Sequence, residues 1–172
     1  TGEENLSALK EGAVLTCNHF SPFDNYVLFH CIRKHLPKKY LYKVIREGNY
    51  TGFKGLYGLF FRHCNTLPLS SNRRTMMNFT KAVNTLLKSG ETILIYPEQE
   101  MWWNYKKPRP FKIGAFKIAK KAGVPILPLV LDYGKKEIII KPLMYPTNNE
   151  EQDIIAFKSL FIGSTGKYQK NS

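Results

Sequence analysis

The amino-acid sequence predicts an α/β fold built on a mixed, mostly parallel β-sheet flanked by helices. Short apolar runs alternate along the chain with segments of helical character, as in proteins with parallel sheets. The clearest run, residues 92–96, is continuous and contains two β-branched isoleucines, which is typical of a strand buried on both faces. Hydrophobic residues make up 43% of the 172 residues, and this suits a single domain with one core.

The first half of the chain is predicted to supply three strands and two helices. Residues 13–17 are apolar and form the first strand, and a helix follows over 22–35, opened by its proline. Residues 40–45 form the second strand. The aromatic and glycine-rich stretch 49–63 is predicted to be an irregular helix, and residues 67–69 a short strand that enters a turn.

The second half adds two helices and three more strands. Residues 73–88 carry apolar residues at the spacing of an amphipathic helix. The helix predicted over 111–122 is ended by the glycine and proline that follow it. Beyond the strand at 92–96, the apolar runs 126–131 and 137–141 complete the predicted sheet.

The charge balance indicates an anionic partner. The 26 Lys and Arg residues exceed the 13 Asp and Glu residues, so the formal net charge is +13. A charge of this size favours nucleic acid, an anionic membrane or phosphorylated substrates. The basic cluster at residues 106–121, which holds no acidic residue, favours a membrane surface, because each cation near an anionic leaflet contributes about 1 kcal/mol.

Cysteine usage and the chain ends bear on the compartment and on membrane attachment. Cys17, Cys31 and Cys64 show no CxxC spacing, which argues against a zinc site or a disulfide framework and suits a reducing compartment. The longest apolar stretch, residues 124–131, is too short and too interrupted by proline to span a bilayer. The polar start without Met fits a fragment or processed form that lacks an N-terminal segment, and the polar residues 163–172 are expected to form a frayed tail.

The segment around His19 carries the candidate chemistry. His19 lies where the strand 13–17 ends and a helix begins, a common position for ligand sites in parallel sheets. A neutral imidazole accepts a proton near neutral pH, and a carboxylate on its other nitrogen fixes the tautomer and stabilises the imidazolium. Asp24 follows five residues later, across a turn, so its side chain can fold back to His19.

Two other interpretations of this segment stay open. Ser21, Pro22 and Asp24 also form the start signal of a helix, in which Asp24 only caps the helix and His19 is an ordinary loop residue. Cys17, two residues before His19 on a strand, raises the alternative of a thiol hydrolase, although small buried cysteines at strand ends are commoner.

Four blocks of the sequence resemble, in order and spacing, the glycerolipid acyltransferases, the family that includes the lysophosphatidic acid acyltransferases. The blocks are residues 18–24 (H-x4-D), 96–98 (compared with F-P-E-G-T-R), 109–116 (compared with PFKxGAF) and 122–129 (compared with AGVPIxPV). The resemblance spans residues 4–131 and implies a glycerol-3-phosphate acyltransferase-like fold.

This resemblance implies the transfer of a fatty acyl group from acyl-CoA or acyl-carrier protein to a hydroxyl of a lysophospholipid or related polyol phosphate. His19 would act as the general base, and Asp24 would orient it. Neither a metal ion nor a bound cofactor is expected. The expected setting is cytoplasmic, with the protein peripheral at the inner face of an anionic membrane.

The acceptor site departs from the family's pattern. Residues 99–101 replace the family's Gly-Thr-Arg, and Ser71 stands where its other arginine is expected, with Arg73 and Arg74 just beyond. Relocated cations can still bind phosphate. The predicted substrate-binding residues are Asn18, Arg73, Arg74, Glu98, Lys106, Lys107 and Arg109.

Other functional classes remain as alternatives: a basic module that binds nucleic acid or an anionic membrane, and an acyltransferase relative that has lost catalysis. The sequence shows no helix-turn-helix, RNP or zinc pattern, which argues against nucleic acid. The aromatic and cationic stretch 52–62 has three open interpretations, which are contact with lipid, the lining of an acyl channel and packing in the core.

Overall fold

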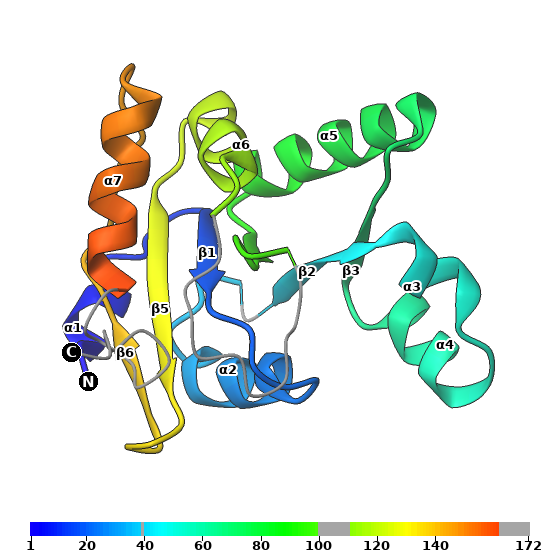
Figure 1. Ribbon diagram of the computed structural model, residues 1–172, viewed down its shortest axis with the longest axis horizontal. Helices are drawn as coiled ribbons and strands as arrows, with labels where there is room; N and C mark the ends of the chain where they lie inside the picture. Colours follow the sequence, from blue (N-terminus) through cyan, green and yellow to red (C-terminus); the bar gives the residue numbers. More distant parts are fainter. Residues whose placement is uncertain (39, 100–110, 162–172) are drawn as a thin grey trace, which may run out of the picture.

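A six-stranded sheet runs through the described part of the chain (Figure 1). The computed structural model describes residues 1–38, 40–99 and 111–161. The strand order is β3-β2-β4-β1-β5-β6, and all neighbouring pairs are parallel except β5 with β6, which is antiparallel. This confirms the predicted α/β fold with a mixed, mostly parallel sheet.

The strands follow the apolar runs of the sequence closely. They are β1 (Ala13–Cys17), β2 (Leu41–Arg46), β3 (Thr66–Leu69), β4 (Thr92–Ile95), β5 (Ile126–Asp132) and β6 (Glu137–Ile140). β1 and β5 are buried along their whole length, because each has a strand on both sides and helices over both faces.

The helices differ from the predicted ones mainly at their ends. They are α1 (Glu3–Leu6), α2 (Asp24–Ile32), α3 (Glu47–Gly52), α4 (Gly55–His63), α5 (Arg73–Lys88), α6 (Gly114–Ala122) and α7 (Glu150–Phe161). α5 has the predicted bounds, α2 and α6 begin later than predicted, and the predicted irregular helix is two short helices. α6 ends at Gly123, whose φ of 70° lies in the left-handed region that glycine adopts without strain.

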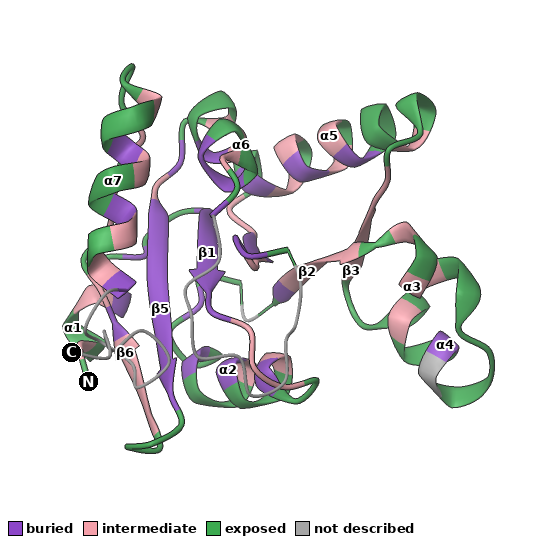
Figure 2. Ribbon diagram, in the orientation of Figure 1, coloured by how far each residue is buried: buried purple, intermediate pink, exposed green. Residues whose placement is uncertain are grey.

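Helices cover both faces of the sheet. α5, α6 and α7 pack on one face through Val83, Phe116 and Phe157, and α1 and α2 pack on the other through Leu6 and Leu28. Figure 1 shows these two layers, and Figure 2 shows the buried residues along β1 and β5 between them. The helices α3 and α4 lie beside the sheet, and none of their described residues belongs to either core cluster.

Helices α1 and α7 were not predicted. The buried residues of α7 are Asp153, Phe157 and Phe161, four apart, but an acidic residue at the first of these positions hides the pattern. Asp153 accepts hydrogen bonds from the backbone N–H and the hydroxyl of Thr147, at 2.8 and 2.9 Å. The buried carboxylate of Asp153 thus fixes the backbone that leads into α7. The sequence pattern instead indicates an exposed carboxylate at this position.

Replacing Phe157 by Ala is expected to lower the free energy of unfolding by about 3–5 kcal/mol. The ring is fully buried, and its centroid lies 5.5, 5.1 and 4.9 Å from those of Phe111, Phe116 and Phe161. Urea denaturation followed by circular dichroism measures the change. Ile155→Ala on the same helix is the control, since Ile155 is 68% exposed and its loss should change stability by less than about 0.5 kcal/mol. Equal effects of the two substitutions would contradict the packing of α7 on the sheet.

Candidate active site

His19 and Asp24 form a hydrogen-bonded pair between β1 and α2. His19 Nδ1 lies 2.9 Å from Asp24 Oδ2. The same oxygen accepts the backbone N–H groups of Phe20 at 2.7 Å and Ser21 at 2.9 Å. The chain therefore turns tightly around this carboxylate, and the turn brings together two side chains that are five positions apart.

Asp24 does more than start a helix. It is the first residue of α2, and Phe23 at the N-cap position makes no side-chain cap hydrogen bond. The Asp24 carboxylate points back to the loop and to the imidazole instead. A neutral His19 that donates Nδ1–H to this carboxylate carries its lone pair on Nε2, and this tautomer is the one required of a general base.

Tyr133, which lies outside every motif of the sequence, binds the second oxygen of Asp24. The Tyr133 hydroxyl donates to Asp24 Oδ1. Tyr133 directly follows β5, and β5 pairs with β1, so the tyrosine reaches the start of α2 from the neighbouring strand. The available sequence signal is its position, immediately after a strand that is buried throughout.

The contacts around Asp24 keep its carboxyl group ionised. Burial raises the pKa of Asp24, but the hydrogen bonds from His19, Ser21, Tyr133 and Phe20 together outweigh burial, so the pKa lies below its ordinary value. Burial and the bond to Asp24 raise the pKa of Tyr133. The phenol therefore keeps its proton and donates it to an ionised carboxylate.

Tyr96 holds the plane of the imidazole. The rings of His19 and Tyr96 are stacked, with centroids 4.0 Å apart and planes inclined by 15°. The Tyr96 hydroxyl donates to Asn25 Oδ1 at 2.9 Å, which ties the residue after β4 to α2. Burial raises the pKa of Tyr96 well above its ordinary value, so the hydroxyl remains a donor.

Asn18 connects the ends of β1 and β5. Its buried side chain donates to the Leu131 carbonyl at 3.0 Å and accepts the Leu131 N–H at 2.8 Å. The paired register of these strands ends at Cys17 and Leu129, so the Asn18 amide continues the connection where the backbone pairing stops. This sets the direction of the loop that carries His19. Substrate binding by Asn18 stays a prediction.

Cys17 is poorly suited to act as a nucleophile. The residue is fully buried, and its Sγ lies 3.5 Å from Asn18 Oδ1. Burial, together with the nearby charges of Asp24 and Glu98, raises the pKa of the Cys17 thiol well above its ordinary value. Since the thiolate is the reactive form, this environment disfavours the alternative of a thiol hydrolase.

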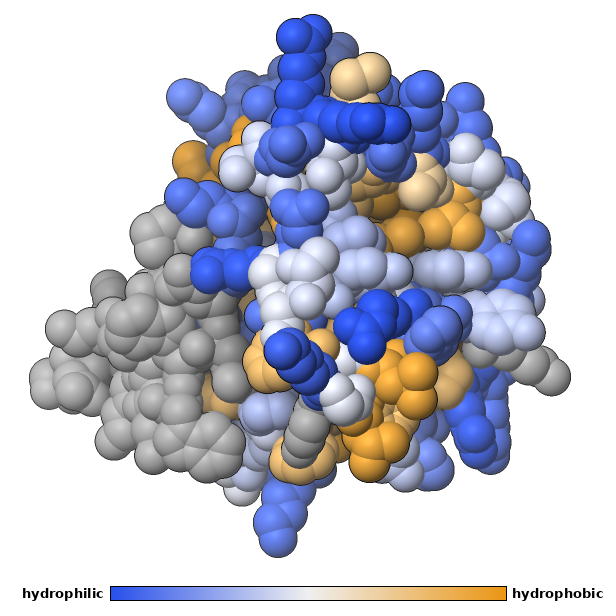
Figure 3. Space-filling model, turned by 90° about the vertical axis from the view of Figure 1, so that its right-hand side faces the viewer, coloured by the Kyte–Doolittle hydropathy of each residue, from blue (hydrophilic) through white to orange (hydrophobic). Residues whose placement is uncertain are grey.

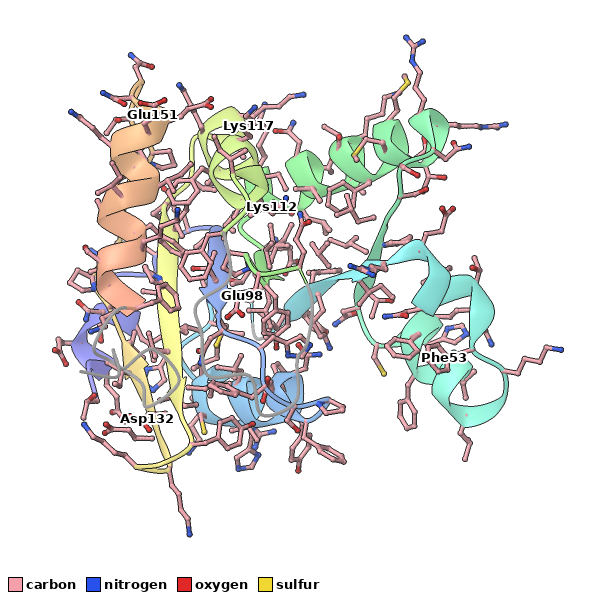
Figure 4. The ribbon with its side chains drawn as sticks, viewed as in Figure 1. Phe53, Glu98, Lys112, Lys117, Asp132 and Glu151 are labelled. Atoms are coloured by element: carbon pink, nitrogen blue, oxygen red, sulfur yellow. The ribbon has the colours of Figure 1, made fainter. Side chains whose placement is uncertain are left out.

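The other predicted substrate-binding residues fall into three groups. Glu98 is buried just after β4, near the middle of the molecule in Figure 4, and its charge acts on Cys17. Arg73 and Arg74 are exposed at the outer end of α5, far from the β1–α2 loop in Figure 1, so the structure does not bring them to the His19–Asp24 pair. Lys106, Lys107 and Arg109 lie outside the described residues.

A cavity of about 480 Å³ adjoins the pair through Tyr133. Its surface is mainly apolar and includes Val27, Ile32 and Ile138, although charged residues such as Glu3 and Lys136 also line it. Tyr133 is the lining residue whose hydroxyl donates to Asp24. Cavities of this size and character bind small apolar ligands or parts of larger ones.

No group of three or more His, Cys, Asp or Glu side chains in residues 1–38, 40–99 and 111–161 is arranged to hold a metal ion. Within the same residues, no helix has the length and apolar character needed to cross a bilayer.

The chain is similar to known acyltransferases over most of its length. Residues 1–132 match the family model described as Acyltransferase. A relative from Chlamydomonas reinhardtii, named 1-acyl-sn-glycerol-3-phosphate acyltransferase, is 31% identical over 130 residues, which are 76% of this chain and 37% of the relative. The chain thus spans little more than a third of that relative's length. Because the family match covers more than half of the chain and includes both His19 and Asp24, the chain belongs to the acyltransferase family.

Proposed function

We propose that this chain is an O-acyltransferase that moves a fatty acyl group from the thioester of acyl-CoA or acyl-carrier protein to a hydroxyl of a lysophospholipid or related polyol phosphate. The observation that carries the proposal is the 2.9 Å contact between His19 Nδ1 and Asp24 Oδ2 in a chain of the acyltransferase family. The name of the algal relative, a 1-acyl-sn-glycerol-3-phosphate acyltransferase, supports a lysolipid as the acceptor.

The proposed reaction is a direct transfer. His19 Nε2 takes the proton of the acceptor hydroxyl while the hydroxyl oxygen attacks the carbonyl carbon of the thioester. A C–O bond forms, the C–S bond breaks, and its electron pair leaves with the sulfur. The imidazolium then gives its proton to the thiolate, so His19 ends the cycle neutral.

The neighbouring residues would prepare His19 for both proton transfers. Ionised Asp24 stabilises the imidazolium, and Tyr133 keeps that carboxylate in place from its other oxygen. Stacking on Tyr96 restricts rotation of the imidazole. A positioned base contributes about 10²–10⁴-fold to the rate, so alignment of the two substrates would supply the rest.

The size of the cavity and the net charge of the chain support the proposed substrates and the proposed membrane location. The apolar cavity of about 480 Å³ beside Tyr133 has room for part of a fatty acyl chain. The net charge of +13 supports action at an anionic membrane, and the inner face of the membrane is the proposed location. We keep Lys106, Lys107 and Arg109 as predicted contacts of the acceptor's phosphate.

His19→Ala is expected to lower kcat by about 10²–10⁴-fold or more, because it removes the base. Asp24→Asn should lower kcat by a similar factor, because the amide no longer stabilises the imidazolium. The assay incubates the purified chain with labelled acyl-CoA and a panel of lysolipids and polyol phosphates, and mass spectrometry identifies the product. His30→Ala, an exposed histidine on α2, is the control and should retain full activity. Unchanged turnover in the His19 variant, with circular dichroism like that of the wild type, would refute the mechanism.

Tyr133→Phe removes one hydroxyl and keeps the ring. We expect kcat to fall by about tenfold with little change in KM, because the lost contact holds Asp24 and touches no substrate. Tyr145→Phe, which removes the hydroxyl of another exposed tyrosine, should leave both constants unchanged. A rise in KM at constant kcat would instead indicate that Tyr133 contacts the substrate.

The same substitution gives a pH-dependent change in stability. The folded-state pKa of Asp24 lies below its ordinary value, so ionised Asp24 stabilises the fold above its unfolded pKa of about 3.9, and this contribution is lost as the pH falls through the folded-state pKa. Tyr133→Phe should therefore lower the free energy of unfolding by about 1 kcal/mol at pH 7 and by less at a pH below the folded-state pKa of Asp24. Urea denaturation at the two pH values measures the difference, and equal deficits at both would contradict this role of the hydroxyl.

A further inference from the structure

An arm of residues 46–63 exposes an apolar face; it consists of the last residue of β2, the helices α3 and α4, and the two residues between the helices. Leu56, Leu59 and Phe60 on α4 are 73%, 49% and 61% exposed. Their spacing of three and four residues places them on one side of the helix. Figure 3 shows a hydrophobic cluster low on this face of the molecule, bordered by hydrophilic side chains. The interpretation that the stretch 52–62 packs in the core is therefore wrong for these three residues.

Contacts inside the arm fix this orientation. A Cβ on Gly58 would lie 2.1 Å from the Phe53 carbonyl oxygen, so only glycine permits α4 to approach this carbonyl. Arg62 Nη1 donates to the same oxygen at 3.3 Å, and the rings of Phe53 and Phe61 lie 5.2 Å apart. These contacts lie on the side of α4 that packs against the rest of the arm. The apolar face of α4 therefore remains exposed.

The charge around this face is mainly positive, since the arm holds Arg46, Lys54 and Arg62 against one acidic residue, Glu47, which accepts a hydrogen bond from Thr75. Residues 48–90 contain six Lys and Arg residues and no Asp or Glu, and the exposed Lys54 and Arg62 belong to the arm itself. Long cationic side chains that border an apolar helical face meet lipid phosphates while the apolar residues enter the acyl boundary. A second copy of the chain fits less well, because a two-fold contact between arms would bring these cations together.

We propose that the arm docks the protein on anionic phospholipid bilayers, with Leu56, Leu59 and Phe60 as the inserted side chains. The proposal rests on the proposed function for one point only, the membrane lipid nature of the acceptor. The docking surface and its residues are identified from their exposure and charge alone, and so do not depend on the proposed function.

Helix α2 supports this orientation of the molecule on the bilayer. Phe23, at the N-cap position of α2, and Tyr26, on the helix itself, are largely exposed. Figure 1 places α2 and α4 in the lower half of the view and α5 and α6 in the upper half. If the lower side of this view meets the lipid, the exposed residues of α2 and the loop that carries His19 come to the same surface as the arm.

Vesicle binding of a triple variant tests the arm. Leu56→Ser, Leu59→Ser and Phe60→Ser together should weaken binding to vesicles that are roughly one third phosphatidylglycerol in phosphatidylcholine by about tenfold or more. Lys54→Gln should weaken it by about fivefold at low salt and by less at high salt. Ile155→Ser is the matched control, since it removes an equally exposed apolar residue from α7, and its binding should equal that of the wild type. Binding of the triple variant within about twofold of the wild type would overturn the proposal.

Two further measurements separate this inference from the proposed function. The triple variant should acylate a short-chain, water-dispersed lysolipid as the wild type does but lose activity on the same headgroup embedded in vesicles. A wild type that binds vesicles through the arm yet acylates no acceptor would refute the proposed function and leave the inference supported. Sedimentation that shows a wild-type dimer and a monomeric triple variant, with vesicle binding unchanged, would assign the arm to self-association and overturn the inference.

Discussion

The buried carboxylate of Asp24 is the constraint on which the arrangement of the site depends. An unpaired charge in the interior costs several kcal/mol, so an ionised Asp24 requires donors on both oxygens. The fold supplies them from the loop before α2, from His19 and from Tyr133 after β5. Loss of any of these donors increases the free-energy cost of keeping the Asp24 carboxylate ionised and buried. The local turn before α2 and the tertiary contact with Tyr133 therefore stabilise the same charge.

The sheet explains why these groups meet. β4, β1 and β5 are neighbours and run parallel, so their carboxyl ends lie at one edge. Each strand places one side chain there shortly after it ends: Tyr96 after β4, His19 after β1 and Tyr133 after β5. A ring stack and two hydrogen bonds thus connect three segments that are far apart along the chain and adjacent in the sheet.

Much of this architecture could be predicted, because burial on both faces leaves continuous apolar runs such as β4 and β5. The His19–Asp24 spacing could also be predicted from its motif, but the choice between a helix cap and a hydrogen-bonded His–Asp pair could not, since the same residues serve both and only the direction of the carboxylate distinguishes them. Apart from its position after β5, Tyr133 carries no local signal, because its partner lies 109 residues away. The exposure of α4 was equally hidden, since an apolar helical face has the same composition whether it packs on a core or on a lipid surface.

The position of Tyr133 has a consequence for dividing the chain into recombinant pieces. The region that matches the acyltransferase family ends at residue 132, one position before this tyrosine. A fragment cut at that boundary would retain every motif residue, yet it would lose the donor to Asp24 Oδ1, the edge strand β6 and the α7 aromatics that cover Phe111 and Phe116. Motif boundaries drawn from sequence likeness are therefore shorter than the smallest piece that holds the Asp24 carboxylate in place.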